Sequence, residues 1–259
     1  LECYYMRKVE QQSTHADERG ANGPSPIAPS QHGEREASAA LGGTSLRRDE
    51  QGLALVGDGM VLRGDFSQLL PRIRKGRLSS ELLVRAAKVR DCAEPWAIDA
   101  TAGLGEDSFL LAAAGFRVSM YESDPTVAAL VRDALNRAQA NPNLADIACR
   151  MELFEEDSIE AMSHLGDTPD VIYLDPMFPE RRKSAAVKKK FQLIHHLEAP
   201  CQNEGALLAA AISAGPRKVV VKRPAKGPHL AGVKPSHSLA GKAVRYDVII
   251  PASIKVPLA

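Results

Sequence analysis

The sequence predicts an α/β fold built on a mostly parallel, doubly wound sheet. From Trp96 onward, short apolar runs alternate with longer segments whose apolar residues recur at helical spacing. Strands that are joined through helices run parallel and need helices on both faces of their sheet. Several of the apolar runs also end in an acidic residue, at the edge where such sheets bind ligands.

The expected elements follow one another in a regular order along the chain. The sequence predicts strands at residues 96–100, 117–122, 149–155, 170–175, 218–224 and 243–250. Helices are expected at residues 106–115 and 125–140, between the first three strands. This βαβαβ succession is typical of a parallel sheet.

The first 95 residues differ in composition from the rest. Residues 1–50 are rich in Gly, Pro, Ser and Ala and predict a low-complexity extension. Residues 51–95 predict a small accessory lobe, with a hairpin around the turn GDG and a serine-capped helix in SSELLVRAAKVR. Residues 96–259 are expected to form the main domain.

Composition narrows the class of protein. The chain has 259 residues, of which 44% are hydrophobic, and a formal net charge of +1. No apolar run approaches the roughly 20 residues of a membrane span, and no signal pattern opens the chain, so we expect a cytoplasmic protein. The cysteines are far apart and the histidines show no ligand spacing, which predicts no metal site.

A glycine-containing turn follows the first strand of the main domain, in DATAGLGED at residues 99–107. Gly103 and Gly105 allow the backbone to pass close to a ligand. The dinucleotide pattern G-x-G-x-x-G would need a third glycine where Ser108 stands, which weakens the prediction of an NAD site.

Acidic residues around this turn favour a different ligand. Asp99 ends the first strand and suits an ammonium group, whereas Glu122 ends the second strand and suits the hydroxyls of a ribose. Glu106 and Asp107 follow the turn and would repel phosphates. S-adenosylmethionine has these groups without a pyrophosphate, so we expect it as the cofactor. Alternatively, Asp99 caps the next segment and Glu122 is a surface acid.

Two further polar residues, Asp157 and Ser158, follow the third strand. An adenine amino group would be expected at this position of the sheet. Either residue would also make a good N-cap for the next helix. The two interpretations are compatible, and the sequence supports both.

The stretch VIYLDPMFPERRK, residues 171–183, carries the predicted chemistry. Its DPMF is similar to the [D/N]-P-P-[F/Y] motif of methyltransferases that modify amines. Asp175 can accept hydrogen bonds from an amine, Pro176 stiffens the turn, and Phe178 can stack on a base. These three are the candidate catalytic residues. Alternatively, DPMFP is a proline-rich turn after a buried strand, with Phe178 in the core.

Basic residues gather near this motif and at the end of the fifth strand. They are expected to contact nucleic-acid phosphates, which position the partner without reading its sequence. These residues are Arg181, Arg182, Lys183, Lys188, Lys189, Lys190, Lys222 and Arg223. A second cluster, RIRKGR at residues 72–77, also favours an anionic partner, although either cluster alone could be a solvated surface.

Taken together, the motifs resemble those of the bacterial small-subunit ribosomal RNA guanine-N2 methyltransferases of the RsmJ type. The resemblance covers about residues 50–250 and depends on DATAGLGED, YESDPTVAALVRDAL, DVIYLDPMFPERRKSAAVKKK and KVVVKRP. It implies a Rossmann-like class I methyltransferase fold, S-adenosyl-L-methionine as the cofactor, and methylation of a guanine N2 amine in small-subunit rRNA. It also implies cofactor contacts from Glu106, Asp107, Glu122, Ser123, Asp157, Ser158 and Asp175.

Other functions stay open at the level of the sequence. The implied partner is small-subunit rRNA or the assembled small subunit, but the same motif would orient a planar amine of a DNA base, a tRNA or a protein amide. A domain that binds RNA through its basic edge without catalysis is a second alternative. An NAD-dependent enzyme is a more distant one.

Overall fold

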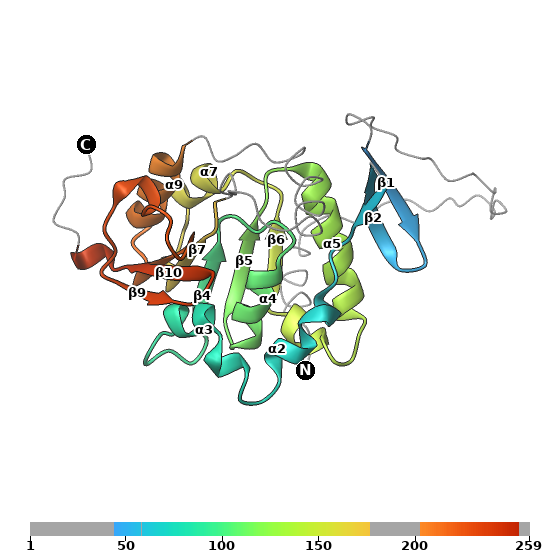
Figure 1. Ribbon diagram of the computed structural model, residues 1–259, viewed down its shortest axis with the longest axis horizontal. Coiled ribbons are helices and arrows are strands. Elements are labelled where there is room, and N and C mark those ends of the chain that lie inside the picture. Colours follow the sequence, from blue (N-terminus) through green and yellow to red (C-terminus); the bar gives the residue numbers. More distant parts are fainter. Residues whose placement is uncertain (1–43, 58, 177–202, 254–259) are drawn as a thin grey trace, which may run out of the picture. The chain divides into compact units, whose positions relative to one another are not determined.

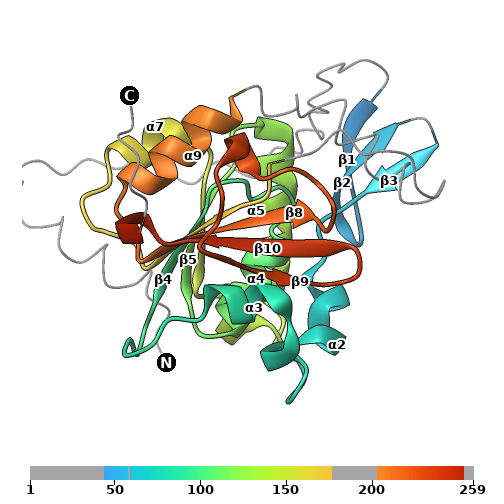
Figure 2. The same ribbon diagram turned by 60° about the vertical axis from the view of Figure 1, so that its left-hand side comes forward.

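The computed structural model describes residues 44–57, 59–176 and 203–253. Its main feature is a seven-stranded sheet with helices on both faces, shown in Figures 1 and 2. The strands are β4 (Trp96–Asp99), β5 (Arg117–Tyr121), β6 (Met151–Phe154), β7 (Val171–Leu174), β8 (Lys218–Pro224), β9 (His237–Ala240) and β10 (Val244–Ile249). The α/β fold class is therefore confirmed.

The strand order is β6-β5-β4-β7-β8-β10-β9. The strands from β4 to β8 pair in parallel, whereas β10 pairs antiparallel with both β8 and β9. All six strands that the apolar runs predict are present, with ends that differ by no more than two residues. Strand β9 was not predicted, because its residues HSLA are mostly exposed and form no apolar run.

Helices cover the two faces of this sheet. On one face lie α3 (Leu82–Ala87), α4 (Glu106–Ala113) and α5 (Pro125–Gln139). On the other lie α7 (Ser158–Ser163) and α9 (Glu204–Ser213). Figure 2 shows α7 and α9 above the sheet and α3 and α4 below it. The two helices predicted between the first strands are confirmed as α4 and α5.

Shorter elements connect these layers. They are α2 (Leu70–Ile73), α6 (Ala145–Ala148) and the 3₁₀ turns η1 (Phe66–Leu69), η2 (Leu78–Ser80), η3 (Leu230–Gly232) and η4 (Pro251–Ser253). The helix predicted in SSELLVRAAKVR begins later than expected, and no serine caps it: the serines lie in η2, and Glu81 is the N-cap of α3. A two-bond pair with Arg72, at 2.9 and 2.8 Å, holds Glu81 in extended backbone before the helix begins.

A second sheet is antiparallel and consists of β1 (Thr44–Asp49), β2 (Gly52–Gly57) and β3 (Met60–Leu62). β2 and β3 form the predicted hairpin. β1 was not predicted: it lies within the residues assigned to the low-complexity extension, although it pairs with β2 along its whole length. Leu55 and Leu62 of this sheet pack with Leu130 of α5, beside which β1 and β2 lie in Figure 1. The division of the chain into an extension, an accessory lobe and a main domain at residues 50 and 95 stays a prediction.

The strand order places a topological switch point between β4 and β7. The chain winds outward from β4 through β5 to β6, and then returns to the other side of β4 with β7. Ligands of such sheets bind outside the carboxyl ends of the strands at this reversal. Asp99 ends β4 and Asp175 follows β7, so the predicted site begins at the switch point.

Candidate active site

The glycine turn leaves β4 at the carboxyl edge of the sheet and leads into α4. Gly103 and Gly105 both have positive φ, at +51° and +75°, and Gly105 is the N-cap of α4. A Cβ on Gly105 would lie 3.2 Å from the ring of Phe66, whereas a Cβ on Gly103 would meet nothing within 4 Å among the residues that the structure describes. The turn is therefore tight against the protein at Gly105 and open at Gly103, where a ligand has room.

Asp99 stabilises this turn through two hydrogen bonds. Its side chain is 1% exposed and accepts hydrogen bonds from the Thr101 backbone N–H at 3.1 Å and from the Ser108 hydroxyl at 2.5 Å. Burial raises the pKa of Asp99 to about 7 despite these two bonds. Both carboxylate oxygens face protein donors, so this geometry supports the capping interpretation better than a direct contact with an ammonium group.

Glu122 follows β5 and connects its end to the glycine turn. It is 8% exposed and accepts hydrogen bonds from the N–H groups of Gly103 at 3.0 Å and Asp124 at 2.9 Å. Burial raises its pKa, and the backbone donors only partly offset this effect. Ser123, the next residue, is exposed. The interpretation of Glu122 as a surface acid is wrong, because the carboxylate is buried beside the opening at Gly103.

Asp157 lies where the third predicted strand gives way to a helix. Its carboxylate accepts hydrogen bonds from the N–H groups of Ile159 at 2.8 Å and Glu160 at 3.2 Å. The N-cap interpretation is thus confirmed for Asp157, while Ser158 is the first residue of α7 and half-buried. Asp157 remains exposed at the carboxyl edge of the sheet, so the cap leaves its side chain accessible to a ligand.

Asp175 follows β7 and lies next to the glycine turn. Its backbone N–H donates to the Thr101 hydroxyl at 2.7 Å, across the switch point. Pro176 is buried beside it, and Phe178 lies outside the described residues. Burial raises the pKa of Asp175, and the nearby Lys222 ammonium only partly offsets the rise.

Lys222 occupies the centre of the site and not its periphery. Its ammonium donates to Asp107 Oδ2 and to Asp175 Oδ2, each at 2.8 Å. The Tyr173 hydroxyl donates to the same Asp107 oxygen at 2.6 Å. Our prediction that Lys222 meets a phosphate is therefore corrected, because the ammonium is held between two carboxylates.

The same prediction is corrected for Arg223, which is 1% exposed. Its guanidinium donates to the Pro228 carbonyl at 2.9 Å and lies 3.4 Å from Glu204. The physical reason is the alternation of side chains along β8. Lys222 shares the α4 face with Val220, whereas Arg223 points to the opposite face with Val221.

The charges around Lys222 determine each other's ionisation. Burial opposes the charge on Asp107, but Lys222 and the hydrogen bonds that Asp107 accepts outweigh burial and lower its pKa. The pKa of Lys222 rises, because Asp107 and Asp175 outweigh the effect of burial. The pKa values of Tyr173 and Tyr246 are raised, first by burial and then by Asp107. Both tyrosines therefore stay neutral near pH 7 and can donate hydrogen bonds.

Arg72 and Glu81 complete the surroundings of Asp107. They form the two-bond pair described above, and both contribute to the electrostatic environment of Asp107. The sequence singled out the cluster at residues 72–77 but not this pairing, nor the roles of Thr101, Tyr173 and Tyr246. A hydroxyl or a tyrosine within an apolar strand gives no signal until the pairing of the strands is known.

The remaining predicted residues contribute differently. Glu106 is exposed in the first turn of α4. The residues outside the described ranges are Phe178, Arg181, Arg182, Lys183, Lys188, Lys189 and Lys190. Within the described ranges, no three His, Cys, Asp or Glu side chains gather as metal ligands. No helix in that part of the chain is long and apolar enough to cross a membrane.

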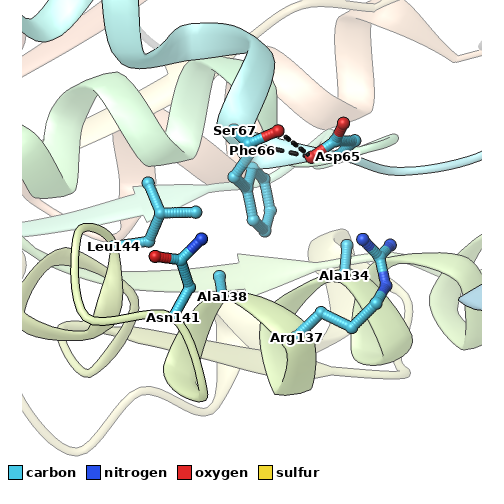
Figure 3. Close-up of a pocket in the computed structure, with 8 residues that line it drawn as sticks. All are labelled: Asp65, Phe66, Ser67, Ala134, Arg137, Ala138, Asn141 and Leu144. Carbon is cyan, nitrogen blue, oxygen red and sulfur yellow. Dashed lines mark hydrogen bonds between the residues drawn. The ribbon is translucent and has the colours of Figure 1, made fainter. Parts of the chain in front are cut away.

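A separate cavity of about 190 Å³ lies between η1 and the C-terminal half of α5 (Figure 3). Its lining residues are Asp65, Phe66, Ser67, Ala134, Arg137, Ala138, Asn141 and Leu144. The carboxylate of Asp65 accepts hydrogen bonds from the N–H and hydroxyl of Ser67, at 3.0 and 2.7 Å. This cavity contains no predicted site residue and is smaller than the roughly 300 Å³ at which ligand pockets begin.

The parallel sheet, the glycine turn at its switch point and the acids beside it define a class I methyltransferase. The family model described as putative SAM-dependent methyltransferase matches residues 44–251. A crystal structure of a SAM-dependent methyltransferase from Neisseria gonorrhoeae has a TM-score of 0.67 and 33% identity, over 89% of each chain.

Curated relatives agree with this class. A protein of Neisseria meningitidis named Ribosomal RNA small subunit methyltransferase J is 43% identical over 206 residues, which is 78% of this chain and 82% of that protein. A protein of the same name from Stutzerimonas stutzeri is 47% identical over 171 residues, or 66% of each chain. The chain belongs to this family of S-adenosylmethionine-dependent methyltransferases, as its motifs predicted.

Proposed function

We propose that the protein methylates the exocyclic N2 amine of a guanine in small-subunit ribosomal RNA. The observation that carries this proposal is the position of Asp175, which follows β7 at the switch point and lies beside the glycine turn. The chain is also 43% identical to a protein named as a small-subunit rRNA methyltransferase. The proposed substrate also implies a cytoplasmic location, because ribosomal subunits are assembled there.

The residues around Gly103 fit S-adenosylmethionine. The open space at Gly103 accommodates a ligand next to the backbone, and the acids after β5 and β6, Glu122 and Asp157, lie along the same edge. Each Glu122 oxygen already accepts one backbone N–H, so Glu122 would accept the ribose hydroxyls through the remaining lone pairs of its carboxylate. Asp157 with Ser158 can meet the adenine amino group. Asp99 supports the turn through Thr101 and Ser108, which gives it an indirect role. The cofactor supplies a methyl group that its sulfonium already activates.

Asp175 is the residue proposed to receive the acceptor amine. An exocyclic amine is a poor nucleophile, because its lone pair is delocalised into the ring. A carboxylate that accepts the amine N–H orients the nitrogen and stabilises the positive charge that develops on it. Lys222 donates to Oδ2 of Asp175, and no described residue donates to Oδ1, which we assign to the amine. Phe178, two residues after Pro176, is proposed to stack on the base.

An RNA partner is supported by exposed cations that follow Arg72 in the sequence. Arg74, Lys75 and Arg77 are exposed in the loop between α2 and η2, two to five residues from the Arg72 side chain that influences Asp107. Such residues suit phosphate contacts, which fix the position of an RNA without reading its bases. The cations of residues 181–190 are proposed to act in the same way.

A methyl-transfer assay with mapping of the product tests this function. Purified protein and labelled S-adenosylmethionine would be incubated with naked small-subunit rRNA, assembled small subunits, tRNA and DNA. We expect label in the small-subunit rRNA, recovered as N2-methylguanosine after digestion to nucleosides. Label in another nucleic acid, or at another guanine atom, would contradict the proposed acceptor. Binding of RNA without transfer to any substrate would favour the non-catalytic alternative.

A further inference from the structure

Lys222 connects two acids that belong to different elements. Asp107 lies in the first turn of α4 and Asp175 follows β7, and the Lys222 ammonium of β8 donates to Oδ2 of both at 2.8 Å. The side chain of Lys222 is 26% exposed, and that of Asp107 is 16% exposed. Asp107 thus lies beside the glycine turn, Asp175 lies at the proposed acceptor position, and one cation joins them.

The balance of charge depends on this cation. The groups around it are Asp107 from α4, Tyr173 from β7, Asp175 after β7, Tyr246 from β10, and the pair of Arg72 in α2 with Glu81 at the N-cap of α3. Asp99 of β4 and the buried Arg223 of β8 also contribute to the field at Asp175. Without Lys222, two partly buried carboxylates would lie close together. The pKa of Asp175, which burial already raises, would then rise further, because like charges in a shared site disfavour ionisation.

A protonated Asp175 would serve the proposed reaction poorly. An ionised carboxylate only accepts hydrogen bonds, whereas a protonated one would present a donor to an amine that also has N–H donors. The orientation of the carboxylate matters as well. With Oδ2 bonded to Lys222 and the backbone N–H bonded to Thr101, the direction of Oδ1 is fixed.

We infer that Lys222 is a positioning residue, which keeps Asp175 ionised, fixes its orientation and joins it to Asp107 beside the cofactor turn. This inference rests on the proposed function, because it concerns the acid that receives the acceptor amine. In this assignment Lys222 acts through Asp175, and not on the base or the methyl group.

The test is the pH dependence of kcat for small-subunit rRNA methylation in two variants with opposite expected shifts. Lys222→Met removes the cation, so the pKa of Asp175 rises and the acid limb of the profile moves to higher pH, by about one to three pH units. Asp107→Asn removes the competing negative charge, so Lys222 then pairs with Asp175 as its single carboxylate partner and the pKa of Asp175 falls. The acid limb of that variant moves to lower pH.

Three controls make the result specific. Lys222→Arg keeps the charge, and we expect its acid limb to stay near that of the wild type. Lys218 lies at the other end of β8, where its ammonium donates to the carbonyls of Ala86 and Lys88 outside the site. The pH profile of Lys218→Met should therefore not shift. Calorimetric titration of each variant with S-adenosylmethionine reports cofactor binding independently of activity.

The outcomes separate this inference from the proposed function. If the wild type does not methylate the rRNA, the proposed function fails. If the wild type is active but Lys222→Met lowers kcat equally at every pH, or Asp107→Asn shifts the limb in the same direction, Lys222 does not act through Asp175 and the inference fails. If Lys222→Met does not fold, Asp107→Asn alone decides: a limb that does not move to lower pH overturns the inference.

Discussion

Thr101 and Asp175 join the two halves of the site directly. The backbone N–H of Asp175 donates to the Thr101 hydroxyl at 2.7 Å, so the turn after β4 fixes the start of the segment after β7. Both residues lie at the switch point between these strands. The position of the proposed acceptor acid therefore depends on the same turn that is proposed to hold the cofactor.

Replacement of this hydroxyl should affect both stability and rate. Thr101→Val keeps the shape of the side chain but leaves the Asp175 N–H without its acceptor, so we expect a loss of about 1 kcal/mol in the free energy of unfolding and a lower kcat. Thr101→Ser keeps the hydroxyl and serves as the control. Urea unfolding and the methylation assay measure the two effects, and equal behaviour of the two variants would contradict this role.

Alanine at the two glycines of the turn should produce different defects. Gly105→Ala places a methyl 3.2 Å from Phe66 at a positive φ, so we expect a loss in unfolding free energy of more than the roughly 1–2 kcal/mol of left-handed strain. Gly103→Ala adds strain without a clash, but its methyl enters the open space. This variant should mainly weaken S-adenosylmethionine binding. Urea unfolding and calorimetry compare them, and stronger cofactor loss in Gly105→Ala than in Gly103→Ala would count against the assignment.

Asp99 should make the stability of the protein depend on pH. Its pKa is about 7 in the folded protein and 3.8 in the unfolded reference, so between these values the folded state retains a proton that the unfolded chain has lost. Stability therefore falls as pH rises through this interval, by up to about 1.4 kcal/mol per pH unit. Asp99→Asn does not titrate, and its stability should lack this decline. Urea unfolding at several pH values measures both proteins. If the unfolding free energies of the wild type and of Asp99→Asn change with pH in the same way, Asp99 is ionised throughout and its pKa is not raised.

Asp133 should be important for attachment of the small sheet to α5. It is 7% exposed and accepts hydrogen bonds from Arg48 at 2.7 Å, the Leu53 N–H at 3.0 Å and Arg137 at 2.8 Å. Asp133→Ala removes the acceptor that the Leu53 N–H, Arg48 and Arg137 share, so we expect a loss of about 2 kcal/mol in unfolding free energy, although the exposed Arg48 can bond water instead. Asp49→Ala, which removes an exposed pair with Arg63, is the matched control and should lose much less. Equal losses in thermal or urea unfolding would contradict the account.

The fold followed from the sequence where an element buries a continuous apolar face. The strands VIYL and KVVVKRP are buried almost throughout, so their apolar runs identify them. β1 and β9 escaped prediction because their residues are largely polar and exposed, and only pairing with a neighbouring strand reveals them. Helix α9, EGALLAAAIS, was not predicted either, because it is apolar around most of its circumference and shows no helical periodicity.

The site was predictable to the extent that it is local. Gly103, Gly105 and Asp175 could be identified because each belongs to a contiguous motif at a strand end. The role of Lys222 could not, because it depends on β8 lying beside β7 and on the side of the sheet to which the lysine points. In the sequence, Lys222 and Arg223 are two adjacent cations; in the structure, the two side chains lie on opposite faces and bond different acids.

The central claim is that Asp175 orients the acceptor amine, and the most direct measurement is the single-turnover rate of methyl transfer to small-subunit rRNA by Asp175→Ala. With saturating S-adenosylmethionine, we expect the rate to fall by about 100-fold or more, while calorimetry shows that the cofactor still binds. Asp175→Asn keeps one acceptor oxygen and should retain more activity than Asp175→Ala. A transfer rate in Asp175→Ala close to that of the wild type would contradict the claim.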